Sequence, residues 1–516
     1  MQHRPTDWIL ILDFGSQYTQ LIARRVRELN VYCEIHPFNK DLTTFDGNPP
    51  KGIILSGGPS SVNDEEAPEL NEDIFDWDIP VLGICYGLQI LAHQAIPGSV
   101  EQAERREFGR SELIVDSDTD LLKEIPQESV VWMSHADHIK QLPPDYQTIA
   151  HTDNAKVAAV RHKQKPIFGV QFHPEVVHTV YGAKILKNYV RSICGLEGTW
   201  TAKSFIESTI KEIREKVGDD RVICGLSGGV DSTVVATLVH EAIGDQLQCI
   251  FVDNGVLRKN EFQDVLDVYE DQLHLPVKGI DASDKFLERL KGVVDPEKKR
   301  TIIGETFIEV FDEAIAHDNS YKYLAQGTLY PDVIESISFK GPSATIKSHH
   351  NVGGLPEEMN LDLVEPVREL FKDEVRNVGR ELGIPEHFIK RHPFPGPGLA
   401  IRILSDVDRD KLDMLREVDD IFISELRKND LYDEVWQALA VLLPVQSVGV
   451  MGDERTYEFT AGLRAVTSVD GMTADWANLP QPFLAHVSNR IINEVRGINR
   501  VVYDISSKPP STIEWE

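Results

Sequence analysis

The chain has 516 residues, enough for about three domains of ordinary size, and 41% of them are hydrophobic. Its 53 basic and 83 acidic residues give a formal net charge of −30, which argues against nucleic acid or an anionic membrane as the main partner. No apolar run approaches the roughly 18 residues that a membrane-spanning helix needs. Five cysteines without a CxxC pair predict neither a disulfide framework nor a zinc site, so we expect a cytoplasmic protein.

The first domain, about residues 1–196, is predicted to be an α/β domain with a parallel sheet. Buried strands are expected at 8–12, 52–56 and 80–84, with helix-like segments between them. The motif DFGSQ follows the first strand, GGPS follows the second, and a cysteine follows the third. Because ligands of such sheets bind at the carboxyl ends of the strands, these motifs are expected to lie together.

Cys85 is predicted to be a nucleophile, because it stands in the sequence GICYG, residues 83–87. Glycines on both sides permit the sharp strand-to-helix turn that presents such a side chain. The backbone N–H groups of Tyr86 and of the turn at Gly58 would form an oxyanion hole. A lone cysteine on an apolar strand is more often a core residue, and we give that interpretation to the other four: Cys33, Cys194, Cys224 and Cys249.

A base for this nucleophile is predicted in the sequence GVQFHPE. In extended backbone His173 and Glu175 point to the same side, and Pro174 favours that backbone. Glu175 would orient the imidazole while its other nitrogen takes the cysteine proton. Most of the 17 histidines are expected to be ordinary surface or core residues.

Over residues 7–195 these motifs resemble the class I glutamine amidotransferase domain. The resemblance implies that glutamine is hydrolysed through a thioester at Cys85, with release of ammonia. It also implies that glutamine is held by four further residues: Gln89, Ser134, His135 and Asp137.

The middle domain, about residues 197–391, contains a predicted phosphate-binding loop. A short strand leads into SGGVDS and then into a helix, so glycine N–H groups and the helix start would face an anion. Asp231 would repel phosphates unless a cation lay between them, which predicts a Mg²⁺ ligand. The alternative is an ordinary β–α turn, since glycine, serine and aspartate also make helix N-caps. The residues expected to hold ATP are Ser227, Gly228, Gly229, Val230, Asp231, Ser232 and Thr233.

This loop is not a G-x-x-x-x-G-K-[ST] loop, which is missing from the chain. It resembles the PP-loop of the N-type ATP pyrophosphatases, which implies an adenylated intermediate and pyrophosphate release. The next strand, 249–253, would place Val252 near the adenine, although an ordinary buried strand is an equal alternative.

Three further cationic positions in this domain are candidates for phosphate contacts. Arg300 lies in the basic cluster 295–304, which usually indicates a solvated face. Lys347 lies in a glycine-rich segment, 339–355, with the composition of a mobile lid. Lys372 is expected on a helix, and both lysines would support the departure of pyrophosphate.

The last domain, about residues 392–516, begins at the turn-rich sequence PFPGPG. We predict an α+β domain with helices near 408–428 and 483–496 and strands near 447–451 and 456–466. The ending KPPSTIEWE is expected to be ordered and docked, with Trp515 buried as its anchor.

Nearly the whole chain resembles the glutamine-hydrolysing GMP synthetase family, through QGTLYPDVIES, PFPGPGLAIR and KPPSTIEWE among other segments. The resemblance implies a homodimer formed by the last domain and a Mg²⁺-dependent reaction of xanthosine monophosphate (XMP) with ATP. It assigns XMP to five positions: Arg300, Gln437, Lys508, Ile513 and Glu514.

Two other interpretations of the sequence remain. A PP-loop amidotransferase that forms NAD or asparagine would not need the KPPSTIEWE ending. A glutamine or nucleotide sensor with inactive sites would not need Cys85, His173 and Glu175 together.

Overall fold

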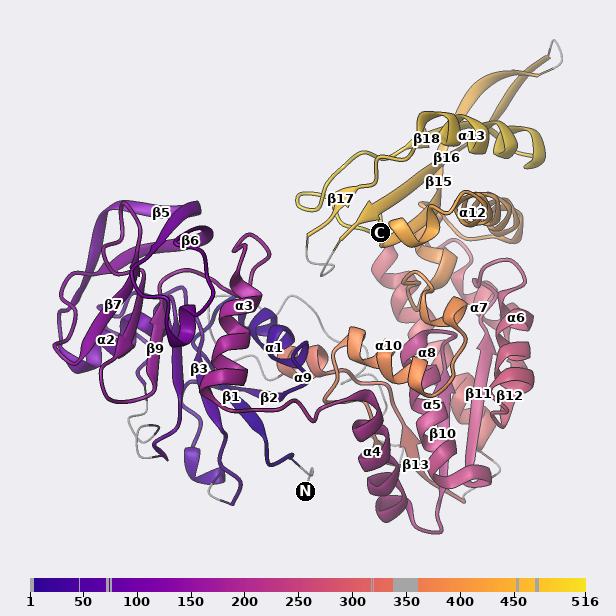
Figure 1. Ribbon diagram of the computed structural model, residues 1–516. Helices are drawn as coiled ribbons and strands as arrows, with labels where there is room; N and C mark the ends of the chain where they lie inside the picture. Colours follow the sequence, from indigo (N-terminus) through magenta and orange to yellow (C-terminus); the bar gives the residue numbers. More distant parts are fainter. Residues whose placement is uncertain are drawn as a thin grey trace. The chain divides into compact units, whose positions relative to one another are not determined.

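The computed structural model of the chain describes residues 4–45, 47–70, 74, 77–316, 318, 320–336, 361–451, 454–468 and 473–516. The chain forms two units, the first from residues 1–205 with 334–347 and the second from residues 206–333 with 348–516. Most of their longer helices and strands are labelled in Figure 1. Among the described helices, none is long and apolar enough to cross a membrane.

A mixed sheet of nine described strands forms the centre of the first unit (Figure 1). Its parallel part runs in the order β2 Tyr32–Pro37, β1 Trp8–Asp13, β3 Gly52–Leu55, β4 Val81–Ile84 and β9 Ile167–Val170. Antiparallel strands continue it in the order β8 Ala159–His162, β7 Tyr146–His151, β5 Val100–Val115 and β6 Glu128–Ile139. The predicted α/β sheet is confirmed, and the antiparallel strands extend it.

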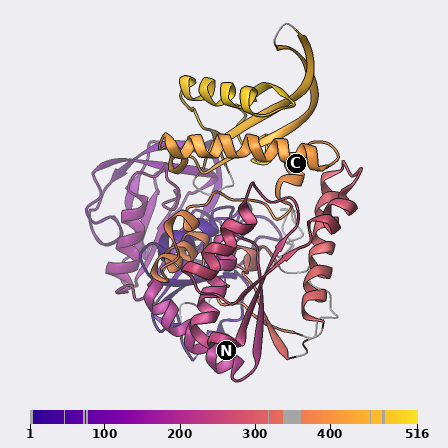
Figure 2. The ribbon, with the colours of Figure 1, turned by 90° about the vertical axis from the view of Figure 1, so that its right-hand side faces the viewer.

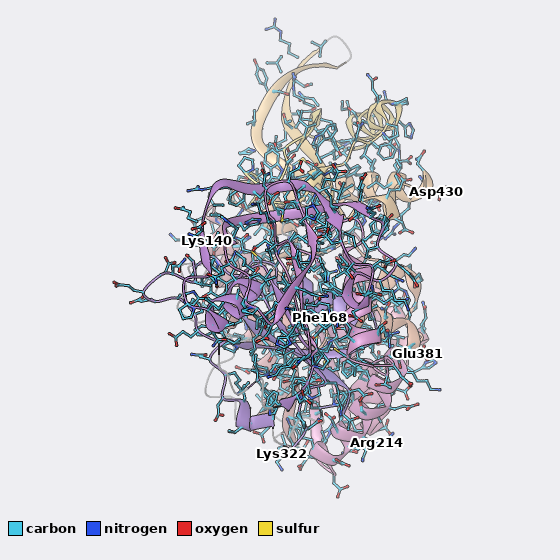
Figure 3. The ribbon with its side chains drawn as sticks, turned by 60° about the vertical axis from the view of Figure 1, so that its left-hand side comes forward. Lys140, Phe168, Arg214, Lys322, Glu381 and Asp430 are labelled. Carbon is cyan, nitrogen blue, oxygen red and sulfur yellow. The ribbon has the colours of Figure 1, made fainter. Side chains whose placement is uncertain are left out.

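The parallel strands β1, β3, β4 and β9 are buried, which explains their apolar sequences, whereas the edge strand β2 is only partly buried and carries polar residues. Residues 8–12 of β1 are 0% exposed. The helices of the unit are α1 Thr19–Arg27, α2 Tyr86–Ala95 and α3 Gly182–Lys187, with the short η1 Leu42–Phe45, η3 Asp120–Leu122 and η4 Asn188–Ile193. At the surface, Lys140, labelled in Figure 3, is 61% exposed and donates to Glu101.

The second unit begins within α4 Ala202–Val217 and contains a parallel sheet of five described strands. The strands run in the order β12 Val277–Asp281, β11 Leu247–Asp253, β10 Arg221–Leu226, β13 Tyr321–Ala325 and β14 Asp362–Val364. β10 is central, and α5 Val230–Ile243 follows it directly. The crevice at the carboxyl end of a central strand is the usual ligand position in such sheets.

Other helices of this unit connect the strands or follow the sheet. They are η5 Gly244–Gln246, α6 Glu261–Asp267, η6 Val268–Gln272, α7 Ser283–Leu290, α8 Pro296–Ile315, α9 Tyr330–Ser336, α10 Lys372–Glu381 and α11 Glu386–Ile389. The side chain of Asp295 caps α8 by accepting from Lys298 N–H, with a proline at the first helical position.

The last part of the second unit is α+β, as predicted. It comprises η7 Gly398–Arg402, α12 Arg409–Lys428, η8 Tyr432–Glu434, β15 Gln437–Met451, β16 Glu454–Thr467, β17 Asp475–Trp476, α13 Gln481–Glu494 and β18 Ile498–Tyr503. The helices α12 and α13 lie beside the β15–β18 sheet, as Figure 2 shows. The first half of β15 lies outside the range predicted for that strand, because residues 437–442 are buried and lack an alternating pattern.

Candidate active sites

Cys85 lies at the turn between β4 and α2 that the sequence predicts. Its φ of 52° and ψ of −104° are strained for a residue with a side chain. The flanking glycines let the turn close, since a Cβ at Gly83 would lie 2.5 Å from Gly87 O and one at Gly87 would overlap Leu55 O. The turn therefore holds the thiol at the carboxyl edge of the sheet, as a nucleophile elbow requires.

His173 and Glu175 follow β9 and form a buried pair. His173 Nδ1 lies 2.7 Å from Glu175 Oε1, and the two side chains are 4% and 0% exposed. Burial lowers the pKa of His173, but the Glu175 carboxylate and Cys85 more than offset this, so that its pKa lies well above 6.5. The imidazole is therefore a strong acceptor for the proton of the Cys85 thiol.

The turn after β3 lies against the start of α2, where the sequence predicts an oxyanion hole. A Cβ at Gly58 would lie 2.7 Å from Phe14 O and 3.3 Å from Tyr86 Cγ, so only glycine allows this approach. Gly87 N–H donates to Ser56 O at 3.1 Å, which fixes the helix start against β3. The two predicted donors, Gly58 and Tyr86, thus lie on touching segments beside the nucleophile.

The four residues expected to hold glutamine come together beside Cys85. Gln89 Nε2 donates to Asp137 O at 3.0 Å, and His135 Nδ1 lies 2.9 Å from the same oxygen. Ser134 O lies 3.8 Å from Cys85 Sγ. α2 and β6 therefore supply two sides of one site from positions far apart in the chain.

Gln171 belongs to this site although it is missing from the predicted set. It is 0% exposed, and its Nε2 donates to Cys85 Sγ at 3.7 Å. Its Oε1 accepts from Gln89 Nε2 at 3.4 Å. The sequence held a signal for it, because Gln171 stands two positions before His173 in the same motif.

Glu107, on β5, is a second buried residue that sequence reasoning missed. Its Oε2 lies 3.3 Å from His135 Nε2. Burial raises the pKa of Glu107, but hydrogen bonds from His135, Ser111 and Thr152 lower it more, so the net shift is downward. No local motif marks this residue, since strand pairing alone brings it to His135.

The predicted phosphate loop lies between β10 and α5. Gly228 has a φ of +74°, which favours glycine. Ser227 Oγ lies 3.1 Å from Ser232 Oγ and accepts from Gly229 N–H at 3.3 Å. The N-cap of α5 is Gly229, without a side-chain hydrogen bond, so serine and aspartate do not cap this helix, whereas a glycine-capped β–α turn remains compatible with the structure. The remaining loop members begin the helix: Val230, Asp231 and Thr233.

Asp231 is paired with Lys372, the first residue of α10. Lys372 Nζ lies 3.1 Å from Asp231 Oδ2, whereas the buried Oδ1 has no hydrogen-bond partner among the described residues. An unsatisfied carboxylate oxygen beside a phosphate loop fits a Mg²⁺ ligand. Among the described residues no group of three His, Cys, Asp or Glu side chains could hold a metal, so a cation here would depend on phosphates.

Val252 lies near the carboxyl end of β11, and its side chain is 2% exposed in the core. Only its backbone is thus available to a nucleotide. Phe251 packs towards the loop, because a Cβ at Gly228 would lie 3.7 Å from its ring. The predicted lid, 339–355 with Lys347, lies outside the described residues.

The chain's ending is docked on the last sheet, as predicted. Glu514 accepts from Gln437 Nε2 at 2.6 Å and from Arg402 Nη2 at 2.8 Å. The fully buried Arg464 donates to Ile513 O at 2.9 Å. The prediction that Trp515 is buried is wrong: its side chain is 39% exposed, because backbone carbonyls and Glu514 carry the docking.

Arg300 and Lys508 lie at two other contacts of this ending. Arg300 Nη2 donates to Glu516 O at 2.8 Å, and the buried Lys299 Nζ lies 3.0 Å from Glu516 Oε2. Lys508 pairs with Ala474 through backbone hydrogen bonds. The interpretation of 295–304 as a solvated face fails at Lys299, which is 0% exposed.

Three family models match the chain in the order of these sites. Glutamine amidotransferase class-I matches residues 10–193, NAD synthase matches 202–304, and GMP synthase C terminal domain matches 424–515. The GMP synthase [glutamine-hydrolyzing] of Cytophaga hutchinsonii is 58% identical over 512 residues, covering 99% of this chain and 100% of the relative. That of Chlorobium chlorochromatii is 60% identical and covers 98% and 99%. The chain belongs to the glutamine-hydrolysing GMP synthase family.

Membership of the GMP synthase family confirms the resemblance seen in the sequence. The NAD synthase match is confined to the phosphate-loop region, whereas the GMP synthase relatives align with almost the entire chain. The match of the last domain, 424–515, includes the docked ending. An NAD- or asparagine-forming amidotransferase is therefore disfavoured.

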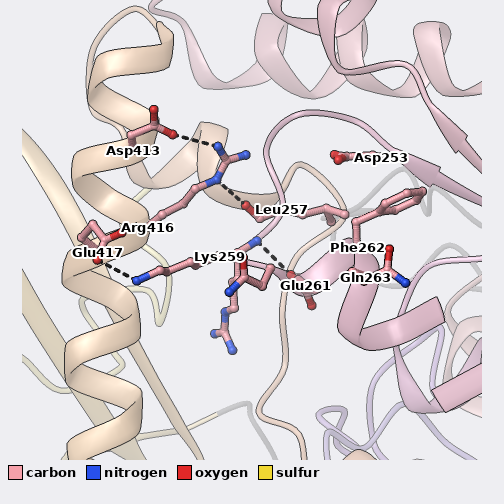
Figure 4. Close-up of a pocket in the computed structure, with 11 residues that line it drawn as sticks. Asp253, Leu257, Lys259, Glu261, Phe262, Gln263, Asp413, Arg416 and Glu417 are labelled. Carbon is pink, nitrogen blue, oxygen red and sulfur yellow. Dashed lines mark hydrogen bonds and ion pairs between the residues drawn. The ribbon is translucent and has the colours of Figure 1, made fainter. Parts of the chain in front are cut away.

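A cavity of about 540 Å³ lies elsewhere in the second unit, between α12 and the segment around α6 (Figure 4). Several of its charged groups are paired with each other: Arg416 with Asp413, and Lys259 with Glu417. The candidate residues for glutamine, ATP and XMP do not line it. We therefore do not assign a substrate to this cavity.

Proposed function

We propose that the chain makes GMP from XMP, ATP and glutamine in the cytoplasm. The observation that carries this proposal is the buried Cys85–His173–Glu175 set in a chain that aligns over nearly its whole length with GMP synthases. The chain's own phosphate loop and docked ending support the second half of the reaction.

Glutamine hydrolysis uses the first unit. His173 takes the Cys85 proton, and the thiolate attacks the glutamine amide carbon. N–H groups of Gly58 and Tyr86 stabilise the oxyanion. The imidazolium then protonates the leaving nitrogen, which departs as ammonia, and water hydrolyses the thioester to glutamate. The glutamine itself is held by Gln89, Ser134, His135 and Asp137.

Amination of XMP uses the second unit. The xanthine C2 oxygen attacks the α-phosphorus of ATP, and pyrophosphate leaves. Ammonia then attacks C2, and AMP leaves with the oxygen while the new amine loses a proton. The residues 227–233 hold the phosphates, with the backbone of Val252 beside the adenine. Asp231 would hold Mg²⁺, which when bound would supply positive charge against the phosphates. Lys372 and Lys347 support the departure of pyrophosphate.

The docked ending is proposed to bind XMP. Glu514 and Gln437 would contact the base or ribose, and Arg300 and Lys508 would face the phosphate, with Ile513 packed beside them. The contacts of Glu514 with Arg402 and Gln437 support this, because they already fix its carboxylate. A charge-assisted contact of this kind contributes about 1.5–3 kcal/mol.

A homodimer through the last domain is also proposed. Apolar side chains on the β15–β16 pair are exposed: Val448 is 49% and Tyr457 is 64% exposed. Such residues on a neighbouring pair of strands support an interface between two copies. Sedimentation of the purified chain tests it.

The decisive experiment mixes the purified chain with ATP, Mg²⁺, glutamine and XMP and measures GMP and pyrophosphate. We expect both products, and neither when XMP is omitted. Replacing XMP by deamido-NAD or by aspartate should give no amidated product. Amidation of either replacement, without GMP from XMP, would overturn the proposal.

A further inference from the structure

Two charged residues behind the phosphate loop are not among the predicted site residues. Arg391 lies just after α11, and Glu261 begins α6. Arg391 Nη1 donates to Gly228 O at 2.9 Å, and its Nη2 pairs with Glu261. Their side chains are 19% and 7% exposed. A guanidinium is thus attached to the main chain of the loop from its outer side.

The bond from Arg391 fixes the plane of one peptide group. In a planar trans peptide the C=O of Gly228 and the N–H of Gly229 point in opposite directions. With the carbonyl held by Arg391, the N–H points to Ser227 Oγ, from which Gly229 N lies 3.3 Å. Ser232 Oγ lies on the same side, 3.1 Å from Ser227 Oγ, and N–H and hydroxyl donors gathered at a glycine turn are the groups that bind a phosphate.

This peptide needs an external restraint because both of its residues are glycines. Gly228 has a φ of +74°, and neither residue has a side chain to limit rotation. A flipped peptide would present a carbonyl oxygen to the phosphates, which repels them. The hydrogen bond from Arg391 opposes that flip.

Glu261 in turn holds the guanidinium in place. Its Oε1 pairs with Arg391, and its Oε2 accepts from Arg258 N–H at 2.9 Å. Both carboxylate oxygens are therefore fixed, and the Phe388 ring centroid lies 5.1 Å from the guanidinium carbon. Glu261, labelled in Figure 4, stands at the start of α6.

We propose that Arg391 and Glu261 are positioning residues for ATP, which keep the Gly228–Gly229 peptide with its N–H towards the phosphates. The inference rests on the proposed function of this loop as the ATP site. It assigns to the pair no contact with ATP itself.

The charges of the pair make positioning separable from simple attraction. If Arg391 acted only as a positive charge near the phosphates, replacing Glu261 by glutamine would remove a repelling charge and tighten ATP binding. If the pair positions the loop, the same replacement loosens Arg391 and weakens ATP binding. The two models therefore predict opposite signs for Glu261→Gln.

The test measures KM for ATP and kcat for GMP formation with ammonia as the nitrogen source. We expect Arg391→Met to raise KM for ATP by about tenfold or more, the loss of one charge-assisted hydrogen bond. Arg391→Lys should have a smaller effect on KM for ATP than Arg391→Met. Lysine keeps the positive charge but lacks the planar guanidinium that can bond Gly228 O and Glu261 at the same time. Glu261→Gln should raise KM for ATP about threefold to tenfold, with KM for XMP changed less.

Arg380→Met is the matched control, because Arg380 pairs with Glu386 on the exposed surface of the same segment. It should leave both KM values within about twofold. Alkylation of Cys85 by a glutamine-like affinity label and thermal unfolding check that each variant is folded. If Arg391→Met does not fold, Glu261→Gln alone decides.

An unchanged or lower KM for ATP in Glu261→Gln would overturn the positioning role. So would an Arg391→Met protein whose KM for ATP equals that of Arg380→Met. A wild-type chain that forms no GMP from XMP, ATP and ammonia would instead overturn the proposed function, which separates the two failures.

Discussion

The glutamine site of the first unit and the phosphate loop of the second differ in how their charged groups are partnered. His173 and Glu175 are 4% and 0% exposed and are paired with each other beside Cys85. Lys372 and Asp231 are also paired, but they are 48% and 26% exposed. In the first site the protein itself sets the protonation of the base. In the second, the pair is accessible, and under the proposed function a phosphate chain and Mg²⁺ would each take one of its partners.

Two buried histidines sharpen the same comparison. In the first unit, burial by itself would lower the pKa of His173. The Glu175 carboxylate and the neighbouring cysteine together raise this pKa by a larger amount, so it lies well above 6.5. In the second unit, burial lowers the pKa of His392 to about 4. His392 Nδ1 accepts from Ala438 N–H, so its other nitrogen donates to Tyr432 O. One histidine is set up to take a proton, and the other is a neutral structural link.

The largest expected effect comes from Cys85→Ala. It should abolish GMP formation from glutamine and leave formation from ammonia, because the thiol serves only the first reaction. The measurement compares GMP formed by the purified variant with each nitrogen source. Glutamine-dependent synthesis at the wild-type rate would show that the two sites are not divided in this way.

Asp231→Asn should lower synthesis with either nitrogen source by about 10²–10³-fold, the usual effect of losing one positioned electrostatic contact. Pyrophosphate release is the readout, with saturating ammonia. The affinity label should still alkylate Cys85. Pyrophosphate release at the wild-type rate would exclude a metal role for Asp231.

Glu514→Gln should raise KM for XMP by about tenfold or more, since it weakens charge-assisted hydrogen bonds. Deleting residues 507–516 should abolish GMP formation at ordinary XMP levels. Trp515→Ala is a milder control, because that side chain is 39% exposed. A folded deletion variant with an unchanged KM for XMP would show that the docked ending stabilises the fold by packing and does not bind XMP.

The smallest expected effect is on stability. The pKa of His392 is lowered in the folded state, so the neutral histidine makes its whole contribution to the free energy of unfolding above pH 6.5. This contribution is lost as the pH falls towards 4, because the unfolded chain takes up the proton more readily. Between pH 7 and pH 5 this loss is about 2 kcal/mol. Urea unfolding at the two pH values measures it. His392→Gln should reduce the difference, and an equal difference in both proteins would contradict the assignment.

The local motifs of this chain were determined by sequence alone. The elbow at Cys85 is marked in the sequence by its own glycines and the strand before it, and the loop around Gly228 is marked by the adjacent residues of its motif. His173 and Glu175 stand two positions apart in one short extended segment, so their side chains face the same side. The α/β class followed from apolar runs separated by helical patterns, and the order of the three matched families agreed with it.

Tertiary structure decided which distant residues support these motifs. Glu107 reaches His135 through strand pairing, Arg391 reaches Gly228 from behind the loop, and Arg402 reaches Glu514 from another segment. Lys299 was expected on a solvated face, yet it is buried, because carbonyls of residues 400 and 403 accept from it. Such partners are brought together only when distant parts of the chain pack against each other. The sequence around each residue therefore does not predict the contact.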